Sequence, residues 1–397
     1  MADAHSSTYF KILDTFPGIM TVFYEDSIEN VSISLRRKYY DYISNDCKLL
    51  EKNSKGGDFF GRKHYDAECR QTFSETWHGH LLQDLALGIG IPDNITTKNN
   101  QSRIVTFLHL IPDGISFNDG DVLYGNLKIV PQKCKRKLTR SCPRIPRNIP
   151  KYKEVFTITQ FWGSGFYHGT LENLPRIAPY LHFLHTHPHI RIHVASKMKY
   201  LNLLHIHSSR LITEPVIHAE ILYMPAGGPC GKSPLFTTQV LADIITNNMT
   251  YNGNQDTLVL IKRSHKRWFN NHDQILTMLR RHASNLKLRV EVFADNPLPH
   301  INKTIEMFSR ALVVIAPHGA GEVNLIFSRP GTLLIEGLCY DSDKKTNLCY
   351  RNMAQALGLR YYGLIYKYQC MKITSKQIER PLLEYLVKQM NYREDNS

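Results

Sequence analysis

The second half of the chain alternates apolar runs with segments of helical periodicity. Apolar runs predict strands at 258–261, 288–293, 311–315, 332–336 and 360–365. Residues spaced as on one helical face predict helices at 272–281, 301–310, 350–357 and 381–390, with Asn271 as an N-cap for the first. Repeated strand–helix units predict a parallel sheet with right-handed crossovers, and therefore an α/β fold.

The middle of the chain is less regular. Strands are predicted at 155–159, 190–194 and 219–223, and a helix at 174–184 that Pro179 should kink. Residues 224–234 are rich in proline and glycine and are interpreted as a hinge between two lobes.

The first 150 residues give the weakest pattern. Strands are predicted at 104–111 and 122–130, with turns at Asp113-Gly114 and Asp119-Gly120. A basic segment with three prolines, 133–153, predicts a surface loop. We therefore expect an N-terminal lobe of 1–235, with 1–150 poorly assigned, a C-terminal lobe of 236–370, and a final helix and tail of 371–397.

The composition predicts a class of binding partner and a cellular compartment. The formal net charge of +14 favours anionic partners, such as phosphorylated small molecules, nucleic acid or anionic membranes. Eight cysteines and five N-x-[ST] sites, at Asn30, Asn94, Asn100, Asn248 and Asn302, favour a lumenal or secreted protein. The start of the chain shows no signal peptide and no apolar run that would span a membrane, so we expect an anchor to be missing, with a cytosolic protein as the alternative.

A glycine-containing turn after the 311–315 strand is the strongest chemical signal. The segment 316–324 reads Ala-Pro-His-Gly-Ala-Gly-Glu-Val-Asn and should join that strand to a helix. Ligands of open α/β sheets bind at the carboxyl ends of the strands, and small residues there let backbone amides approach phosphate oxygens. His318 and the backbone of Gly319, Ala320 and Gly321 are therefore candidate diphosphate ligands. A tight turn without a ligand is the alternative, and Glu322 counts against an anion.

Two further candidates should lie on the same rim of the sheet. The segment 262–267 reads Lys-Arg-Ser-His-Lys-Arg and follows the 258–261 strand, so Arg263 and Arg267 could clamp the same diphosphate. Glu336 ends its strand, and its carboxylate could accept hydrogen bonds from ribose hydroxyls. A solvated basic loop and a surface carboxylate are the respective alternatives.

A candidate base comes from the other half of the chain. His168 lies in a glycine-containing loop between a predicted strand and a predicted helix, and a neutral imidazole there can act as general base. Glu172 could orient His168 or replace it. A structural histidine is the alternative, because the chain has nineteen.

Metal binding is not expected. Asp119-Gly120-Asp121 and Asp341-Ser342-Asp343 resemble D-x-D motifs but sit where turns favour aspartate. The histidine-rich run His182 to His193 should be part strand, which would divide its side chains between two faces.

Together these motifs resemble the family 61 glycosyltransferases, over about 155 to 365. The resemblance includes Phe166, Tyr167 and His168, then Glu172, Leu174, Pro175 and Arg176, the segment from Lys262 and Arg263 to Asn270, and His318-Gly319-Ala320-Gly321 followed by Asn324, Phe327, Pro330, Gly331 and Glu336. Each motif alone is weak, whereas their order across some two hundred residues is specific.

The resemblance implies a GT-B architecture of two Rossmann-like lobes with a cleft between them, and the donor in the C-terminal lobe. It implies inverting, metal-independent transfer of GlcNAc or a pentose such as xylose from a UDP-sugar to a hydroxyl of a glycan or protein, in the Golgi or endoplasmic reticulum. The donor residues would be Lys262, Arg263, Arg267, His318, Gly319, Ala320, Gly321, Glu322, Asn324 and Glu336, with His168 and Glu172 catalytic and no cofactor besides the donor substrate.

Two departures leave alternatives open. Glu322 stands where the family usually has an apolar residue, which would suit a non-catalytic nucleotide-sugar or glycan-binding protein of the same fold. We assign residues 1–150 to no pattern of the family, so the sequence does not identify the acceptor. Nucleic-acid binding through 133–153 is a third reading, although no interleaved aromatic residues support it.

Overall fold

A computed structural model describes residues 10–16, 19–24, 106–124, 127–129, 145–196, 199–225, 231, 235–247, 254–339, 347–366 and 373–394. The chain divides into two compact units, Met1–Cys230 and Gly231–Ser397. The α/β class predicted from the sequence is confirmed, because both units are built on sheets with parallel strands and carry helices. The GT-B arrangement stays a prediction.

The second unit is built on a parallel sheet. Its described strands are β10 (Thr257–Lys262), β11 (Arg289–Ala294), β12 (Ala311–Pro317), β13 (Leu333–Cys339) and β14 (Arg360–Tyr366), in the spatial order β11-β10-β12-β13-β14. Every neighbouring pair runs parallel. The order reverses between β10 and β12, so this pair is the topological switch point of a doubly wound sheet.

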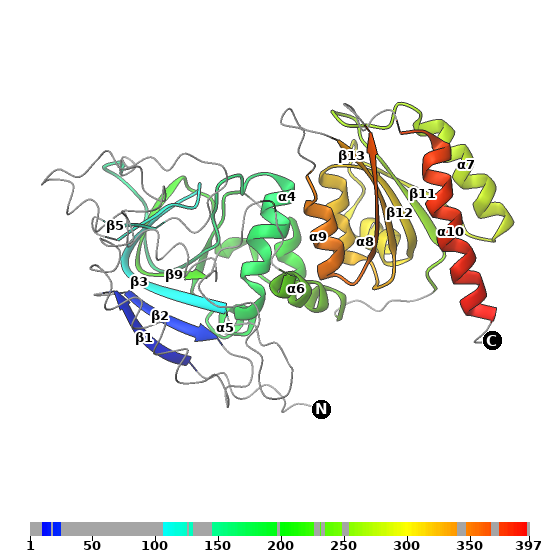
Figure 1. Ribbon diagram of the computed structural model, residues 1–397. Helices are drawn as coiled ribbons and strands as arrows, with labels where there is room; N and C mark the ends of the chain where they lie inside the picture. Colours follow the sequence, from blue (N-terminus) through cyan, green and yellow to red (C-terminus); the bar gives the residue numbers. More distant parts are fainter. Residues whose placement is uncertain are drawn as a thin grey trace, which may run out of the picture. The chain divides into compact units, whose positions relative to one another are not determined.

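Helices cover both faces of this sheet (Figure 1). On one face lie α7 (His272–Asn285) and α10 (Ser375–Glu394), which contact each other. The other face carries α8 (Ile301–Ser309), the 3₁₀ segment η6 (Ala320–Phe327), α9 (Cys349–Ala356) and α6 (Leu235–Asn247). Because both faces are covered, β12 is buried along its whole length, which explains its continuous apolar sequence.

The strands and helices predicted for the second half are present, with three differences. The helix α6 was not predicted. The last helix begins at Ser375 and passes through Pro381, where the prediction began it. Asn271 does hold the N-cap position of α7, but its side chain makes no capping hydrogen bond.

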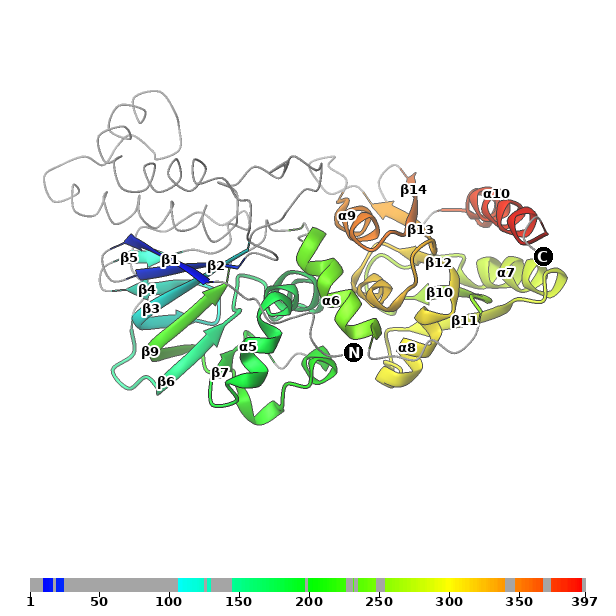
Figure 2. The same cartoon turned by 90° about the horizontal axis from the view of Figure 1, so that it is seen from below.

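The first unit has a mixed sheet (Figure 2). Its described main path runs β1 (Phe10–Phe16), β2 (Ile19–Tyr24), β3 (Thr106–Phe117), β9 (Val216–Pro225), β6 (Lys151–Thr157), β7 (Arg191–His193), β8 (Leu211–Ile212). The four strands from β9 to β8 pair in parallel, whereas β1, β2, β3 and β9 pair antiparallel. Only part of this sheet is therefore Rossmann-like.

Three local predictions for the first unit were wrong. Asp113-Gly114 is not a turn, because β3 continues through it in register with β9, and a Cβ at Gly114 would lie 2.8 Å from the Leu222 Cβ. The strand predicted at 122–130 is a hairpin of β4 (Val122–Tyr124) and β5 (Leu127–Ile129). The single helix predicted at 174–184 is divided into η2 (Leu174–Arg176), η3 (Ala178–Tyr180) and α5 (Leu181–Thr186). The disruption predicted at Pro179 is nevertheless present, because Pro179 falls in the first turn of η3. The turn at Asp119-Gly120 is present, with Gly120 at φ 95°.

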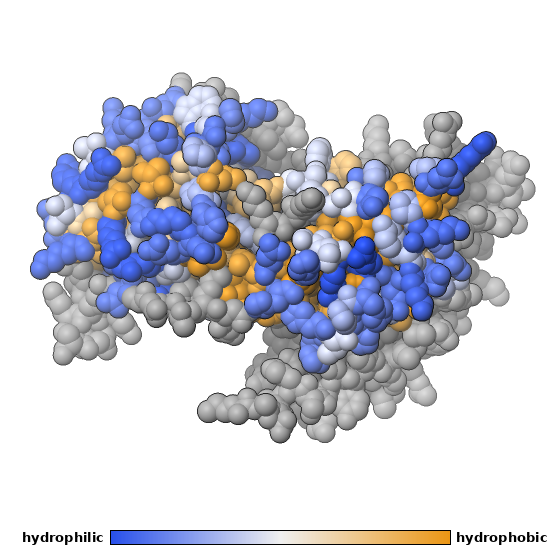
Figure 3. Space-filling model, turned by 180° about the vertical axis from the view of Figure 1, so that it is seen from behind, coloured by the Kyte–Doolittle hydropathy of each residue, from blue (hydrophilic) through white to orange (hydrophobic). Residues whose placement is uncertain are grey.

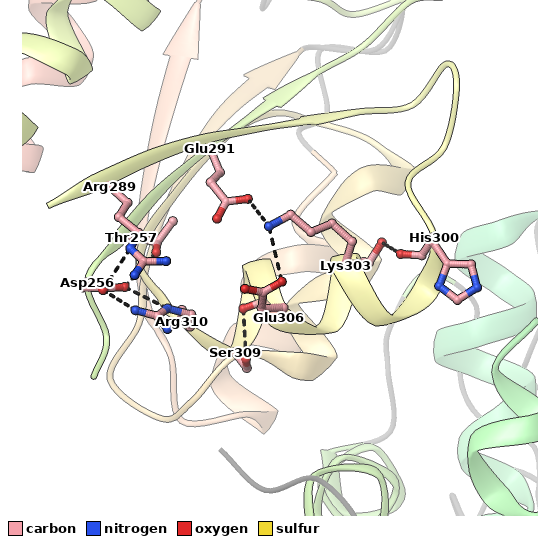
Figure 4. A network of polar contacts seen from close by, with 10 residues as sticks. Asp256, Thr257, Arg289, Glu291, His300, Lys303, Glu306, Ser309 and Arg310 are labelled. Carbon is pink, nitrogen blue, oxygen red and sulfur yellow. Dashed lines mark hydrogen bonds and ion pairs between the residues drawn. The ribbon is translucent and has the colours of Figure 1, made fainter. Parts of the chain in front are cut away.

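An ionic network lies near the amino ends of β10 and β11 in the sheet of the second unit (Figure 4). Asp256, just before β10, accepts a hydrogen bond of 3.1 Å from Arg310 Nε and lies 3.4 Å from Arg289 Nε. Lys303 on α8 pairs with Glu291 at 3.2 Å and with Glu306 at 3.3 Å. These contacts join the starts of β10 and β11 to α8 and leave the carboxyl ends of the strands for other uses.

Figure 3 shows one face of the molecule, coloured by the hydropathy of its residues. In the view of Figure 3, hydrophilic residues predominate over both units and hydrophobic residues form smaller patches among them. Among the helices of the described residues, none combines the length and apolar character that crossing a bilayer needs.

Of the predicted basic loop, only 145–153 is described, and of the five sequons only Asn302, an exposed residue in the first turn of α8.

Candidate functional site

The two loops singled out in the second half of the chain lie side by side at the switch point. β10 and β12 are adjacent and parallel, so Lys262 and Pro317, where they end, stand on the same edge of the sheet. The loop after β12 carries His318 and Gly319, and the loop after β10 carries Arg263. Open α/β sheets bind ligands at this position, because the connections on either side of it lead to opposite faces.

Arg263 joins the two loops directly. Its Nη1 donates a hydrogen bond of 2.7 Å to the backbone oxygen of His318, and its Nε lies 4.0 Å from the Asp295 carboxylate after β11. A Cβ on Gly319 would lie 1.7 Å from Arg263 Nη1 and 2.3 Å from its Cζ. Gly319 has extended backbone angles, φ 161° and ψ −179°, so glycine is needed there for the close approach of Arg263 and not for its own conformation.

A buried relay orients His318. Its Nδ1 lies 2.5 Å from Glu336 Oε1, and Tyr361 on β14 donates to Glu336 Oε2 at 2.7 Å. The Tyr350 ring packs edge-on against the imidazole, with centroids 5.3 Å apart. Burial, followed by the nearby charge of Glu336, raises the pKa of Tyr361, so its hydroxyl remains a donor. With Nδ1 held by Glu336, the Nε2 atom of His318 is the nitrogen left to meet a ligand.

Glu322 lies beneath the glycine turn instead of facing solvent. It is fully buried, its Oε2 accepts from the Gly319 amide at 2.8 Å, and among the described residues its Oε1 has no hydrogen-bond partner. Burial and then the charge of Glu336 raise the pKa of Glu322 well above its usual value. The neutral form is therefore favoured, which removes the repulsion that a charged glutamate would exert on an anion.

The remaining donor candidates differ in exposure. Lys262 and Arg267 are exposed, whereas Asn324 is buried and donates from Nδ2 to the Gly321 oxygen at 2.8 Å. Lys266 and Arg267 both have left-handed backbone angles, φ 46° and 56°. Successive non-glycine residues in this region are uncommon and concentrate at functional loops.

His318, Glu322 and Glu336 also have the donor types of a cation site. Within the part of the chain that the structure describes, they are the one such group, with ligand atoms within 4.8 Å of one another. However, His318 Nδ1 and Glu336 Oε1 lie at hydrogen-bond distance, which suits a shared proton better than an ion between them. The expectation that no metal is needed stays a prediction.

The first unit holds the second predicted constellation. His168 ends the short helix α4 (Phe166–His168), and Glu172 lies in the π-helical turn η1 (Gly169–Asn173). His168 Nδ1 lies 2.8 Å from Glu172 Oε2, and Gln160 Nε2 donates to the same oxygen at 2.8 Å. Glu172 is fully buried, whereas the His168 side chain is 27% exposed. A carboxylate only accepts, so His168 donates from Nδ1, and Nε2 is the ring nitrogen that does not face Glu172.

The structure thus groups the predicted residues into two sets. The donor candidates gather at the switch point of the second unit, and His168 and Glu172 pair in the first. Three contributors escaped the sequence analysis: Tyr361, Asp295 and Gln160. Asp295 carried a readable signal, because it lies two residues after the strand predicted at 288–293.

The discounted motifs have structural explanations. Asp119 and Asp121 lie at the β3–β4 hairpin, where Asp119 Oδ1 accepts from the Asp121 amide at 3.3 Å. Asp341 and Asp343 lie outside the described residues. In the histidine-rich run, His185 donates to the Leu204 oxygen, His187 to the Phe183 oxygen, and His193 lies 2.9 Å from Ser116 Oγ.

Part of the chain is similar to known proteins. Residues 166–335 match the Glycosyltransferase 61 family model, a span that begins two residues before His168 and ends one residue before Glu336. The chain is also similar to the Xylan glycosyltransferase MUCI21 of Arabidopsis thaliana, with 26% identity over 106 residues. That match covers 27% of this chain and 21% of the relative, so the chain spans about a fifth of the length of the curated relative it matches. The resemblance to the glycosyltransferase 61 family that the sequence motifs predicted is therefore confirmed over residues 166–335.

Proposed function

We propose that the protein is an inverting glycosyltransferase that moves a sugar, GlcNAc or a pentose such as xylose, from a UDP-sugar to a hydroxyl of a glycan or protein. The observation that carries the proposal is the contact between Arg263 and the His318–Gly319 backbone at the switch point of the second unit. It places a guanidinium, an oriented imidazole and a glycine turn together, and diphosphates bind such groups.

In this proposal the second unit stabilises the leaving group. Arg267 is exposed and supplies positive charge, His318 offers Nε2, and the amides of Ala320 and Gly321 begin η6. The Gly319 amide already donates to Glu322, so its part is to hold the turn. Both oxygens of Glu336 are engaged within the protein, so we assign Glu336 to orienting His318 in place of binding ribose.

The first unit supplies the base. His168 Nε2 takes the proton of the acceptor hydroxyl as its oxygen attacks the anomeric carbon, and the bond to the diphosphate breaks with its electron pair leaving on UDP. Glu172 fixes the tautomer of His168. The GT-B arrangement, in which the two units meet around the reacting atoms, belongs to this proposal.

UDP binding measured by calorimetry tests the donor site. Arg267→Ala should weaken UDP binding about tenfold, since it removes one charge-assisted contact. Arg280→Ala, which removes an exposed arginine on α7, is the matched control and should bind UDP like the wild type. Equal loss in both variants, or in neither, would place the diphosphate elsewhere.

Transfer assays test the base. His168→Ala should lower kcat by about 10²–10⁴ while UDP binding is kept. His182→Ala, an exposed histidine of α5, is the control. If the wild type binds UDP but never transfers or hydrolyses the donor, the protein is a nucleotide-sugar-binding protein of the same family.

A secretory-pathway location is also proposed, on the basis of the N-x-[ST] sites in the sequence. Expression in a eukaryotic host followed by glycosidase digestion should increase gel mobility, and Asn302→Gln should remove part of that change. A chain without any glycan would argue for the cytosol.

A further inference from the structure

Trp162 is an exposed aromatic residue held in an unfavourable backbone conformation. It has φ 67°, in the left-handed region, and 57% of its surface is exposed. This conformation is uncommon for a bulky side chain and costs free energy, and exposure of an indole gains none in return. An exposed tryptophan in this conformation is explained if its ring binds a ligand.

The surrounding turn leaves the indole uncovered. Trp162 is followed by Gly163, Ser164 and Gly165, which have little or no side chain. A Cβ on Gly163 would lie 2.6 Å from Asn173 Nδ2 and 2.9 Å from the Gln160 oxygen, so the turn is pressed against η1. The Phe161 ring packs edge-on to the indole with centroids 4.7 Å apart, which fixes one side of it.

The same turn is tied to the His168–Glu172 pair. Gln160 accepts the Gly163 amide at 2.9 Å through its backbone oxygen, and its side chain donates to Glu172 at 2.8 Å. The Gly165 amide donates to the Trp162 oxygen at 2.8 Å. A Cβ on Gly165 would lie 3.2 Å from that oxygen and 3.7 Å from His168 Cδ2. The Trp162 backbone and the His168 imidazole therefore flank the same glycine.

The chemistry beside Trp162 suits a sugar ring. One face of a pyranose consists of C–H groups that pack on a flat aromatic surface, while its hydroxyls point outward toward polar groups. Here an indole that is 57% exposed belongs to the same turn as an imidazole that is 27% exposed. One indole is far smaller than the roughly 800 Å² per partner that a stable protein contact buries.

We propose that Trp162 stacks against the acceptor, and that the acceptor is a saccharide whose reactive hydroxyl is thereby brought to His168. This inference rests on the proposed function, because it assigns the acceptor side of the same site. A peptide hydroxyl as acceptor is the competing outcome.

Steady-state transfer with the full chain tests the assignment. The acceptors are a xylo-oligosaccharide and a serine/threonine peptide, and the variants are Trp162→Ala and Trp162→Phe. Trp162→Ala should raise the saccharide KM about tenfold and leave kcat and UDP affinity nearly unchanged, with Trp162→Phe between it and the wild type. Tyr362→Ala removes an aromatic residue of β14 that is 40% exposed and lies outside the proposed donor and acceptor residues, and it should leave the saccharide KM unchanged.

The outcomes separate this inference from the proposed function. A wild type that binds no UDP and transfers no sugar refutes the proposed function and leaves no acceptor to assign. A wild type that transfers to the saccharide with the same KM as Trp162→Ala refutes the role of Trp162 alone. Transfer to the peptide only, or an equal rise in the saccharide KM for Tyr362→Ala, also overturns the inference.

Thermal unfolding gives a readout that a structural role would not produce. Glycine accepts a φ of 67° without strain, so Trp162→Gly should unfold at a temperature at least equal to the wild type and about 2–4 °C above Trp162→Ala. The same variant should show the raised saccharide KM. A Trp162→Gly variant that unfolds well below the wild type would mean that the indole serves packing.

Discussion

Gly319→Ala isolates the contact on which the donor site depends. The new Cβ would lie 1.7 Å from Arg263 Nη1, so the guanidinium has to leave its position. It then loses its hydrogen bond of 2.7 Å to the His318 oxygen. A hydrogen bond from a charged donor contributes about 1.5–3 kcal/mol, and because φ at Gly319 is extended, alanine adds no backbone cost. We therefore expect UDP affinity to fall about 10- to 100-fold.

A double-mutant cycle measured by calorimetry tests this explanation. If Gly319 matters because it leaves room for Arg263, then Gly319→Ala should have little further effect in an Arg263→Ala background. The coupling free energy should then be about 1.5–3 kcal/mol. Additive effects, with coupling below about 0.5 kcal/mol, would refute the reasoning.

Gly331→Ala provides the opposite case as a control. Gly331 has φ 86°, and an added Cβ meets no atom within 4 Å among the described residues. Its substitution should cost about 1 kcal/mol of folding stability through backbone strain, measured by urea unfolding, and should show no coupling to Arg263.

The other predictions concern buried groups and their titration. Tyr361→Phe removes the 2.7 Å hydrogen bond to buried Glu336 and should lower the free energy of unfolding by about 1.5–3 kcal/mol at pH 7 in urea titrations; an unchanged midpoint would contradict the relay. The raised folded pKa of Glu322 means that ionising it opposes folding, so wild-type stability should fall as pH rises above about 4.5, and Glu322→Gln should remove that fall in melts between pH 5 and 8. Burial alone would raise the pKa of Asp256, but hydrogen bonds from Arg310 and Thr257 and the charges of Arg310 and Arg289 outweigh it and lower the pKa. Asp256→Asn should therefore lower the free energy of unfolding by about 1 kcal/mol at pH 7, and this difference from the wild type should vanish as pH falls below about 4. Equal stability of the two proteins at every pH would mean that the ion pairs contribute nothing to folding.

The second unit was predictable because its central strands β10, β12 and β13 are buried on both faces. Such strands read as unbroken apolar runs, and β12 shows this along its whole length. The helix α6 was missed because its sequence is rich in threonine, valine and isoleucine, residues typical of strands, and it owes its place to packing on α9 and η6. The true start of α10 was legible: Thr374 and Gln377 exchange capping hydrogen bonds of 2.8 and 3.3 Å in the T-x-x-Q pattern.

The candidate site was predictable in position but only partly in roles. Sequence spacing put the loops after β10 and β12 on one rim. It could not show that Glu336 and Glu322 are buried and bonded within the protein, because burial depends on what packs above each side chain. Gln160 and Tyr361 were not predicted for the same reason. Gln160 bonds to Glu172, which is 12 residues away in sequence, and Tyr361 bonds to Glu336, which is 25 residues away.

The guanidinium that rests on Gly319 also divides this rim into fixed and replaceable positions. Arg263 and Gly319 are interlocked, so neither should tolerate exchange unless the other changes with it. Lys266, Arg267 and Trp268, in contrast, are exposed and lie on the same loop between that anchor and buried Phe269. A library directed at donor preference would therefore keep Arg263, Arg267 and Gly319 and vary positions 266 and 268, where new side chains can be tried without disturbing the sheet below.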